Sequence, residues 1–197
     1  TTVFETRLSF PKSSNIMGST KGIMWNCGGL RRDTASTYSK VMYFEKTFKN
    51  KFDFFFFLET HHKNKSELPD EILRYEDTHH IIHSETKEGD THTGIIGLIS
   101  KEYTVDEIEQ LVQGRILRFR MTDSTSNITH KLSVVYLPTN KNIKLDDMKI
   151  FLHKLRLTNN TDDPNYMIIG DFNFIDHSVD KKNGLSAKDQ EINQIWI

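Results

Sequence analysis

The sequence predicts an α/β domain of layered β-sheets with helices packed on their outer faces. Two observations lead to this prediction: roughly seven short apolar runs have the length and composition of strands, and two longer segments repeat apolar residues at helical spacing. The chain has 197 residues, of which 36% are hydrophobic and 27% charged. This length and composition are typical of one globular domain with a sizeable core. We therefore expect a single domain over residues 1–197, with its core at 22–197 and an N-terminal extension at 1–20.

The first predicted elements are a strand at 22–27 and a helix at 36–51. The helix is predicted because Val41, Phe44 and Phe48 fall on one helical face. The run after it is apolar without alternation, which is typical of a central strand covered on both sides. Strands are then predicted at 53–60, 79–83, 93–100, 115–121 and 131–136.

The last predicted elements are a helix and a strand that ends in polar residues. The helix begins at Asp146 and has apolar residues at helical spacing up to Leu155. The strand lies in MIIGDFN (167–173), where an aromatic residue separates Asp171 from Asn173. If the backbone stays extended there, the two polar side chains point to the same side. We therefore expect a carboxylate and an amide together at the carboxyl end of this strand.

Composition excludes several classes of protein. The formal charge is -1, with 26 basic and 27 acidic residues, so the chain lacks the overall basic field of a passive nucleic-acid binder. The single cysteine, Cys27, excludes an internal disulfide framework and a thiolate-rich zinc site, and it fits a reducing compartment. We find neither a signal peptide nor a membrane span in the sequence. An intracellular location, nuclear or cytoplasmic and not secreted, is therefore expected, with no membrane partner.

Four of the predicted strands end in polar residues. Asn26 ends the first, Glu59 the phenylalanine-rich run, Tyr136 the strand before the second helix, and Asp171 with Asn173 the last. Carboxyl ends of strands converge on one rim in layered α/β folds, so these residues are expected to share a cleft. Two carboxylates with amide and phenol support suit Mg²⁺ or Mn²⁺, with Glu59 and Asp171 as ligands. Such a site suits phosphoester hydrolysis.

The order and local context of these residues resemble the endonuclease/exonuclease/phosphatase superfamily. Within it the chain is most similar to the apurinic/apyrimidinic-type endonuclease domains of non-LTR retrotransposons. The stretches that carry the resemblance are MWNCGGLRR (24–32), FFLETHHK (56–63), TGIIGLIS (93–100), GRILRFRM (114–121), VVYLPTN (134–140) and MIIGDFN (167–173). GDFN after an apolar strand is fairly specific to the family. Each of the other stretches is weak alone, but all six together occur in the family's order, which makes the resemblance strong. The resemblance implies a sandwich of two mixed β-sheets flanked by helices and a Mg²⁺-dependent DNA-nicking endonuclease.

The resemblance also assigns roles to the residues of the first half of the chain. Asn26 matches the asparagine that braces the site, and Glu59 matches the glutamate that binds the metal. His61 falls where retrotransposon members often have a histidine, with a less settled catalytic role. Lys63 and Lys65 follow this strand and are candidates for phosphate contacts, as are the two arginines at 31 and 32, although a solvated loop is an equal alternative for each.

In the second half, the resemblance assigns three further catalytic roles. Tyr136 matches the tyrosine that contacts the scissile phosphate. Asp171 resembles the aspartate that orients the attacking water, and Asn173 resembles the asparagine that hydrogen-bonds to a phosphate oxygen. The substrate implied is DNA, but phosphoinositide and sphingolipid phosphoesterases share the metal chemistry, and RNA or an abasic site stays open as well.

Two departures from the family pattern bear on activity. Leu58 stands where members usually have glutamine, and the Ser-Asp-His motif that closes the family pattern is not found before Ile197. The domain is therefore expected to be C-terminally incomplete, and this chain alone to be weakly active or inactive. A longer enzyme completed by a further segment is one explanation. The alternative is a catalytically degenerate relative that serves as a binding or structural component of an assembly with protein partners.

A zinc cluster is a weaker alternative for the histidines. The residues concerned are His61, His62, His79, His80 and His83. Their spacing does not require a common site, because neighbours on a strand point to opposite faces.

Overall fold

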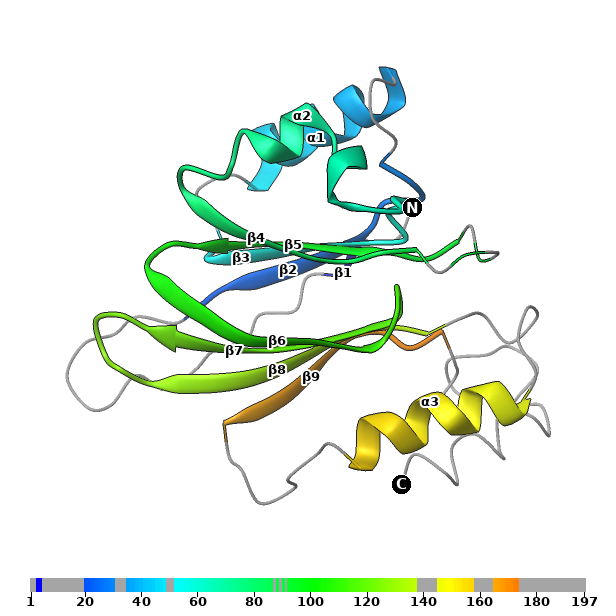
Figure 1. Cartoon of the computed structure of the whole chain (residues 1–197). Helices are drawn as coiled ribbons and strands as arrows, with labels where there is room; N and C mark the ends of the chain where they lie inside the picture. Colours follow the sequence, from blue (N-terminus) through cyan, green and yellow to red (C-terminus); the bar gives the residue numbers. More distant parts are fainter. Residues whose placement is uncertain are drawn as a thin grey trace, which may run out of the picture.

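Two β-sheets pack face to face between helices in the computed structural model (Figure 1). The structure describes residues 3–4, 20–30, 35–48, 52–86, 88, 90, 92–137, 145–157 and 165–173. In these residues α1 and α2 cover the outer face of one sheet and α3 covers the outer face of the other (Figure 1). The predicted fold class, two mixed sheets flanked by helices, is therefore confirmed.

The first sheet has five strands in the order β1-β2-β3-β5-β4. Its central pair, β2 and β3, is parallel, and the other pairs are antiparallel. One member, β1, lies within the segment predicted as an N-terminal extension and pairs with β2. The bounds are β1 Val3–Phe4, β2 Gly22–Asn26, β3 Phe54–Leu58, β4 His79–Ser84 and β5 Ile95–Ser100.

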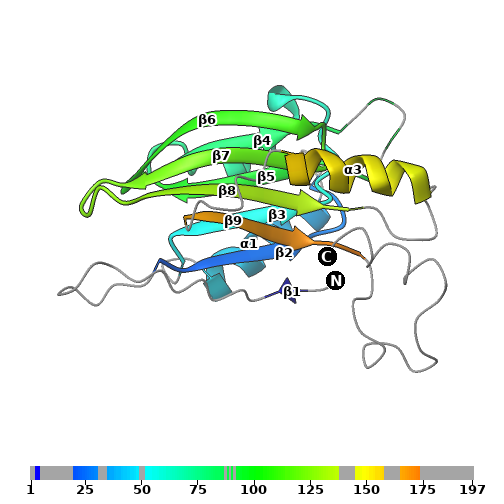
Figure 2. The same cartoon turned by 90° about the horizontal axis from the view of Figure 1, so that it is seen from below.

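The second sheet has four strands in the order β6-β7-β8-β9. Only β8 and β9 are parallel, and Figure 2 shows their arrowheads at the same end of the sheet. The bounds are β6 Tyr103–Val112, β7 Ile116–Asp123, β8 Thr129–Tyr136 and β9 Tyr166–Asp171. Every strand predicted from the sequence is present, with ends shifted by at most two residues.

The edge strand β6 was not predicted from the sequence. Its residues are mostly exposed and three of the ten are acidic, so it lacks the apolar alternation that marks a half-buried strand. The strand is stabilised instead by ion pairs with its neighbour β7: Arg120 binds Asp106 at 2.6 Å, and Arg118 pairs with Glu109. Charged side chains on an exposed edge also discourage pairing with another chain.

The helices are α1 Ala35–Phe48, α2 Asp70–Leu73 and α3 Leu145–Leu157, with a short 3₁₀ turn at Lys65–Glu67. Val41 and Phe44 of α1 pack in one cluster with Phe55 and Phe57 of β3, so these two residues of the predicted apolar face are buried. The long helices were predicted, and the short α2 and 3₁₀ turn were not. No helix in the described part of the chain is long and apolar enough to cross a membrane.

The phenylalanine run is buried on both sides, as its lack of alternation predicted. Phe54, Phe56 and Leu58 face the second sheet in the main core, while Phe55 and Phe57 face α1. Leu58, which departs from the family pattern, is fully buried in that core between the sheets. An apolar residue there fits its surroundings, because an unpaired amide in the same place would cost free energy.

A glycine lets β9 approach β8 closely. A Cβ on Gly170 would lie 2.1 Å from the Val135 carbonyl oxygen. The close approach sets the register in which Gly170 pairs with Val135 and Asp171 pairs with Tyr136.

We expect Gly170→Ala to lower the free energy of unfolding by about 1–3 kcal/mol, because the added methyl overlaps backbone that cannot rotate away. Urea unfolding followed by circular dichroism measures this, with Lys131→Ala on the exposed side of β8 as the control. Equal midpoints for the two variants would contradict the close approach.

Candidate active site

Four of the predicted site residues lie where the parallel strand pairs of the two sheets end. Asn26 closes β2 opposite Leu58, and Glu59 follows directly. In the other sheet Tyr136 and Asp171 are register partners at the ends of β8 and β9. Two hydrogen bonds join the sheets at this point. The Tyr136 hydroxyl donates to Glu59 Oε2 at 3.0 Å, and the Asn26 side-chain amide donates to Asp171.

The turn after β3 holds Glu59 in an uncommon backbone conformation. Glu59 has a φ of 58° and His61 a φ of 62°, in the left-handed region that non-glycine residues rarely adopt and that stores strain. Backbone hydrogen bonds fix this turn: the His61 N–H donates to the Thr93 carbonyl at 2.8 Å, and the Gly29 N–H donates to the Glu59 carbonyl at 2.6 Å. The Glu59 carboxylate is thereby aimed at the opposite sheet.

The Tyr136 side chain lies between the Glu59 carboxylate and the Arg115 guanidinium. Burial, and then the negative charge of Glu59, raise the pKa of Tyr136 above its usual range, so the phenol stays protonated and donates. The Arg115 guanidinium lies 5.1 Å from the centre of its ring and is itself bound to Asp90 at 2.8 Å. Arg115 lies in one of the stretches that carry the family resemblance, GRILRFRM (114–121), but nothing in that stretch predicted its position over Tyr136.

Asp171 is half-buried and hydrogen-bonded. Burial raises the pKa of its carboxyl, the Asn173 backbone N–H and the Asn26 side chain lower it, and the nearby charge of Glu59 raises it. The Asn173 N–H donates to Asp171 Oδ1 at 3.1 Å. The two carboxylates from different sheets are thus close enough for their charges to interact.

Asn173 does not continue the strand as predicted. β9 ends at Asp171, and Asn173 has a φ of 51°, so the backbone turns and the prediction of an extended chain there was wrong. Asparagine tolerates this conformation better than most residues. Its side-chain amide donates to the Leu137 carbonyl, which places the residue beside the Tyr136 end of β8.

Two of the five histidines considered for zinc, His62 and His83, lie beside each other. His62 and His83 lie with ring centres 5.5 Å apart, and burial, then the His83 charge, lower the pKa of His62 to about 3. His80 instead bonds to the Tyr103 carbonyl. His79 lies against the Thr78 hydroxyl at 2.8 Å. Within the described residues the five histidines considered for zinc therefore do not form one cluster, because only His62 and His83 face each other.

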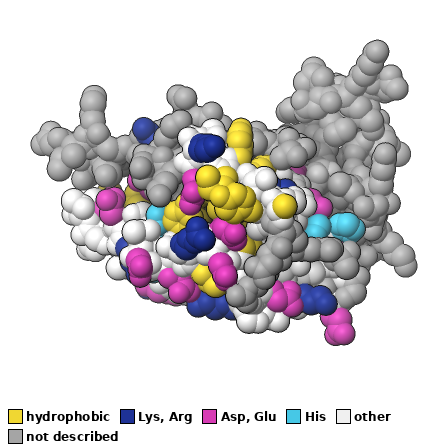
Figure 3. Space-filling model, turned by 90° about the horizontal axis from the view of Figure 1, so that it is seen from above, with side chains coloured by type: hydrophobic (Ala, Val, Ile, Leu, Met, Phe, Trp, Pro, Cys, Tyr) yellow, Lys and Arg dark blue, Asp and Glu magenta, His cyan; other side chains and the backbone are white. Residues whose placement is uncertain are grey.

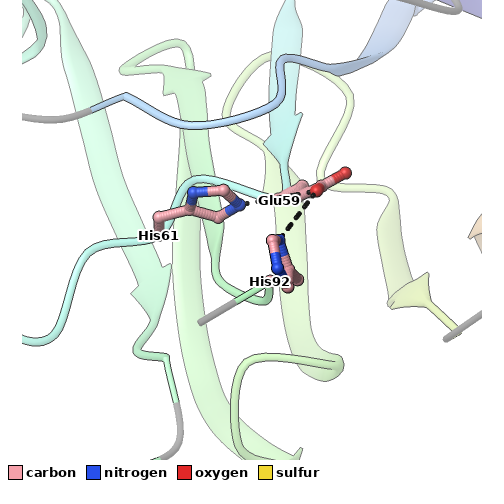
Figure 4. A group of neighbouring side chains, drawn as sticks. All are labelled: Glu59, His61 and His92. Carbon is pink, nitrogen blue, oxygen red and sulfur yellow. Dashed lines mark ion pairs between the residues drawn. The ribbon is translucent and has the colours of Figure 1, made fainter. Parts of the chain in front are cut away.

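His61 does have a different histidine beside it. Glu59, His61 and His92 have ligand atoms that all lie within 4.8 Å of one another, as Figure 4 shows. His92 was not predicted as a site residue. It lies just before β5, and only the folded pairing of Thr60 and His61 with Thr93 and Gly94 brings it to the site. No sequence signal could have shown this.

The basic candidates lie outside this arrangement as far as they are described. Lys63 is exposed, and Lys65 is exposed and pairs with Glu76 at 3.5 Å. The arginines at 31 and 32 lie outside the described residues. Among the described residues on the face above α1 and α2, acidic and basic side chains are interspersed (Figure 3).

No family model matches the sequence, and no curated protein matches it. Solved structures do match. TDP2 from C. elegans has a TM-score of 0.55 at 18% identity, over 79% of this chain and 48% of that one. AP endonuclease LMAP from Leishmania major gives 0.58 at 16%, over 90% and 64%. The endonuclease domain of TRAS1, a telomere-specific non-LTR retrotransposon, gives 0.56 at 12%, over 88% and 69%.

The chain thus spans about half of the first of these proteins and about two-thirds of the other two. At these identities the likeness concerns the fold alone. The chain has the fold of the endonuclease/exonuclease/phosphatase superfamily.

Proposed function

We propose that the chain is the catalytic part of a divalent-metal-dependent phosphodiester hydrolase that nicks DNA. The proposal depends on one observation. Glu59 and Asp171, one from each sheet, lie close enough for their charges to interact, and each is hydrogen-bonded, to Tyr136 and Asn26 respectively. Two of the structurally similar proteins are named as endonucleases, one an AP endonuclease and one the endonuclease domain of a retrotransposon. Their names support DNA as the substrate.

The donor atoms between the two sheets fit a hard cation. Glu59 and Asp171 contribute carboxylate oxygens, and the phenol and amide neighbours orient them. Oxygen ligands of this kind suit Mg²⁺ or Mn²⁺. When bound, such an ion neutralises charge on the phosphate and on the leaving oxygen.

We assign to Asp171 the role of orienting the attacking water and accepting its proton. Asp171 Oδ1 accepts from the Asn173 N–H, which leaves the other carboxylate oxygen to accept a proton from water as the water attacks phosphorus. A new P–O bond forms, the bond to the leaving sugar oxygen breaks, and the strand is nicked. The Asn26 amide holds the carboxylate in place through its hydrogen bond.

Tyr136, Asn173 and His61 are assigned supporting roles around the phosphate. Tyr136 fixes the Glu59 carboxylate through its hydroxyl, and contact with a phosphate oxygen would require this one proton to turn from Glu59 to the substrate. Asn173 uses one amide N–H for the Leu137 carbonyl, and the second is the donor that a phosphate oxygen would accept. His61 lies against the other Glu59 oxygen at 3.4 Å.

Metal removal tests this function. The protein translated from the full reading frame that contains these residues is expected to convert supercoiled plasmid to the nicked form in Mg²⁺ or Mn²⁺. EDTA is expected to abolish the conversion, and added Mg²⁺ to restore it, since the ion screens phosphate charge. A parallel preparation with Asp171→Asn controls for contaminating nuclease. EDTA-resistant nicking, or no nicking with either ion, would contradict the proposal.

A further inference from the structure

The two oxygens of the Glu59 carboxylate have different surroundings. Oε2 accepts the Tyr136 hydroxyl at 3.0 Å on the side of the second sheet. Oε1 faces two imidazoles, with His61 Nε2 at 3.4 Å and His92 Nδ1 at 3.7 Å (Figure 4). Glu59 Oε1 therefore faces two nitrogen donors, of which only His61 has a role in the proposed hydrolysis.

The spacing of these three atoms fits a small tetrahedral ion. All three lie within 4.8 Å of one another. With bonds of about 2.0–2.1 Å, two ligands of a tetrahedral zinc ion are about 3.3–3.4 Å apart. The observed 3.4 and 3.7 Å are close to that separation. The two imidazole rings stand nearly perpendicular, at 82°, so they are not stacked on each other.

We propose that Glu59 Oε1, His61 Nε2 and His92 Nδ1 bind one zinc ion or a similar transition-metal ion. Imidazole nitrogen favours Zn²⁺, Cu²⁺, Fe²⁺ or Ni²⁺, whereas Mg²⁺ prefers carboxylate and water. This position is thus chemically distinct from the oxygen-only position between Glu59 and Asp171. It shares Glu59 and His61 with the proposed hydrolytic site, but metal binding by these three side chains can be measured without hydrolysis.

The protein pre-organises two of the three ligands. Glu59 and His61 sit in left-handed backbone conformations fixed by hydrogen bonds to the start of β5. Gly29 leaves room for the His61 ring, because a Cβ there would lie 3.0 Å from His61 Nδ1. Tyr136 orients the carboxylate from behind, as outer-shell partners of metal ligands do.

The third ligand leaves the site open to solvent. The His92 side chain is 71% exposed, so a metal ion held there would keep at least one position for water or another ligand. Three protein ligands and an open position are typical of reactive rather than purely structural zinc sites.

Zinc titration by calorimetry on chelator-treated protein tests the inference. We expect one Zn²⁺ per chain at this site, and affinity lowered by at least about tenfold in His92→Ala, which removes a ligand. His153→Ala, an exposed histidine on α3, is the matched control and should bind as the unmodified protein does. Co²⁺ in place of zinc should give the visible absorption of a tetrahedral site, lost in His92→Ala.

Two results would overturn the inference: no Zn²⁺ binding, or equal binding by the His92 and His153 variants. Either would mean that Glu59 only forms ion pairs with the two imidazoles. Because the readout is binding, zinc bound by a protein that fails to nick DNA would leave this inference standing and refute the proposed function instead. Nicking in Mg²⁺ without zinc binding would do the reverse.

Discussion

Asp171→Asn is expected to lower the rate of DNA nicking by about 10²- to 10⁴-fold, the range that a positioned acid or base contributes. The substitution keeps an oxygen that can accept from the Asn173 N–H and the Asn26 amide. It removes the basicity needed to take a proton from water and the charge that would bind a cation. The loss should therefore be one of function, with Tm unchanged.

Nicking rates under excess enzyme, with thermal unfolding of the same samples, measure both halves of this prediction. Asp77→Asn, at an exposed turn residue away from the site, is the matched control and should retain full activity. A nicking rate for Asp171→Asn within a few-fold of the control would remove Asp171 from the mechanism. A large fall in Tm would show that the residue acts mainly on the fold.

Phe56→Ala is expected to lower the free energy of unfolding by about 3–5 kcal/mol, because a large buried ring leaves a cavity when it is removed. Phe56 is 0% exposed and belongs to the core between the sheets. Its ring lies 5.8 Å from that of Phe119 in the opposite sheet, and Gly97 leaves it room on the neighbouring strand. Loss of this ring weakens the contact that holds the two sheets together.

Chemical unfolding monitored by circular dichroism measures the effect. Tyr38→Ala is the matched control, because this α1 side chain is 51% exposed and its removal should cost little. Comparable losses in the two variants would show that the sheets are held together elsewhere. A variant with too little folded protein for a baseline would instead agree with the large expected loss.

The elements that the sequence predicted are those whose burial leaves a pattern. β3 has an apolar run because both of its faces are covered, and α1 has an apolar stripe because only one face is. β6 escaped prediction because its acidic residues are stabilised by arginines on β7, which is a relation between strands and not a local repeat. The short α2 leaves too few residues for a period to show.

The candidate site likewise has residues whose positions the sequence could predict and residues whose positions it could not. Asn26, Glu59, Tyr136 and Asp171 could be expected together because each ends or directly follows a strand, and the carboxyl ends of strands converge on one rim in layered α/β folds. The sequence did not show that they come from two different sheets. His92 could not be expected there, because its position depends on how one loop is pinned beside another. The backbone of Asn173 could not be predicted either, since β9 ends at Asp171 and the chain turns where the alternation suggested an extended backbone.

In the described residues, each sheet is built from one uninterrupted portion of the chain, β1 to β5 before residue 101 and β6 to β9 after residue 102. Asn26 and Glu59 come from the first portion, and Tyr136 and Asp171 come from the second. Cutting the chain at the exposed Lys101–Glu102 link would give two fragments that each carry half of the site. Complementation between those fragments would then report, through recovered hydrolysis, whether the halves have docked.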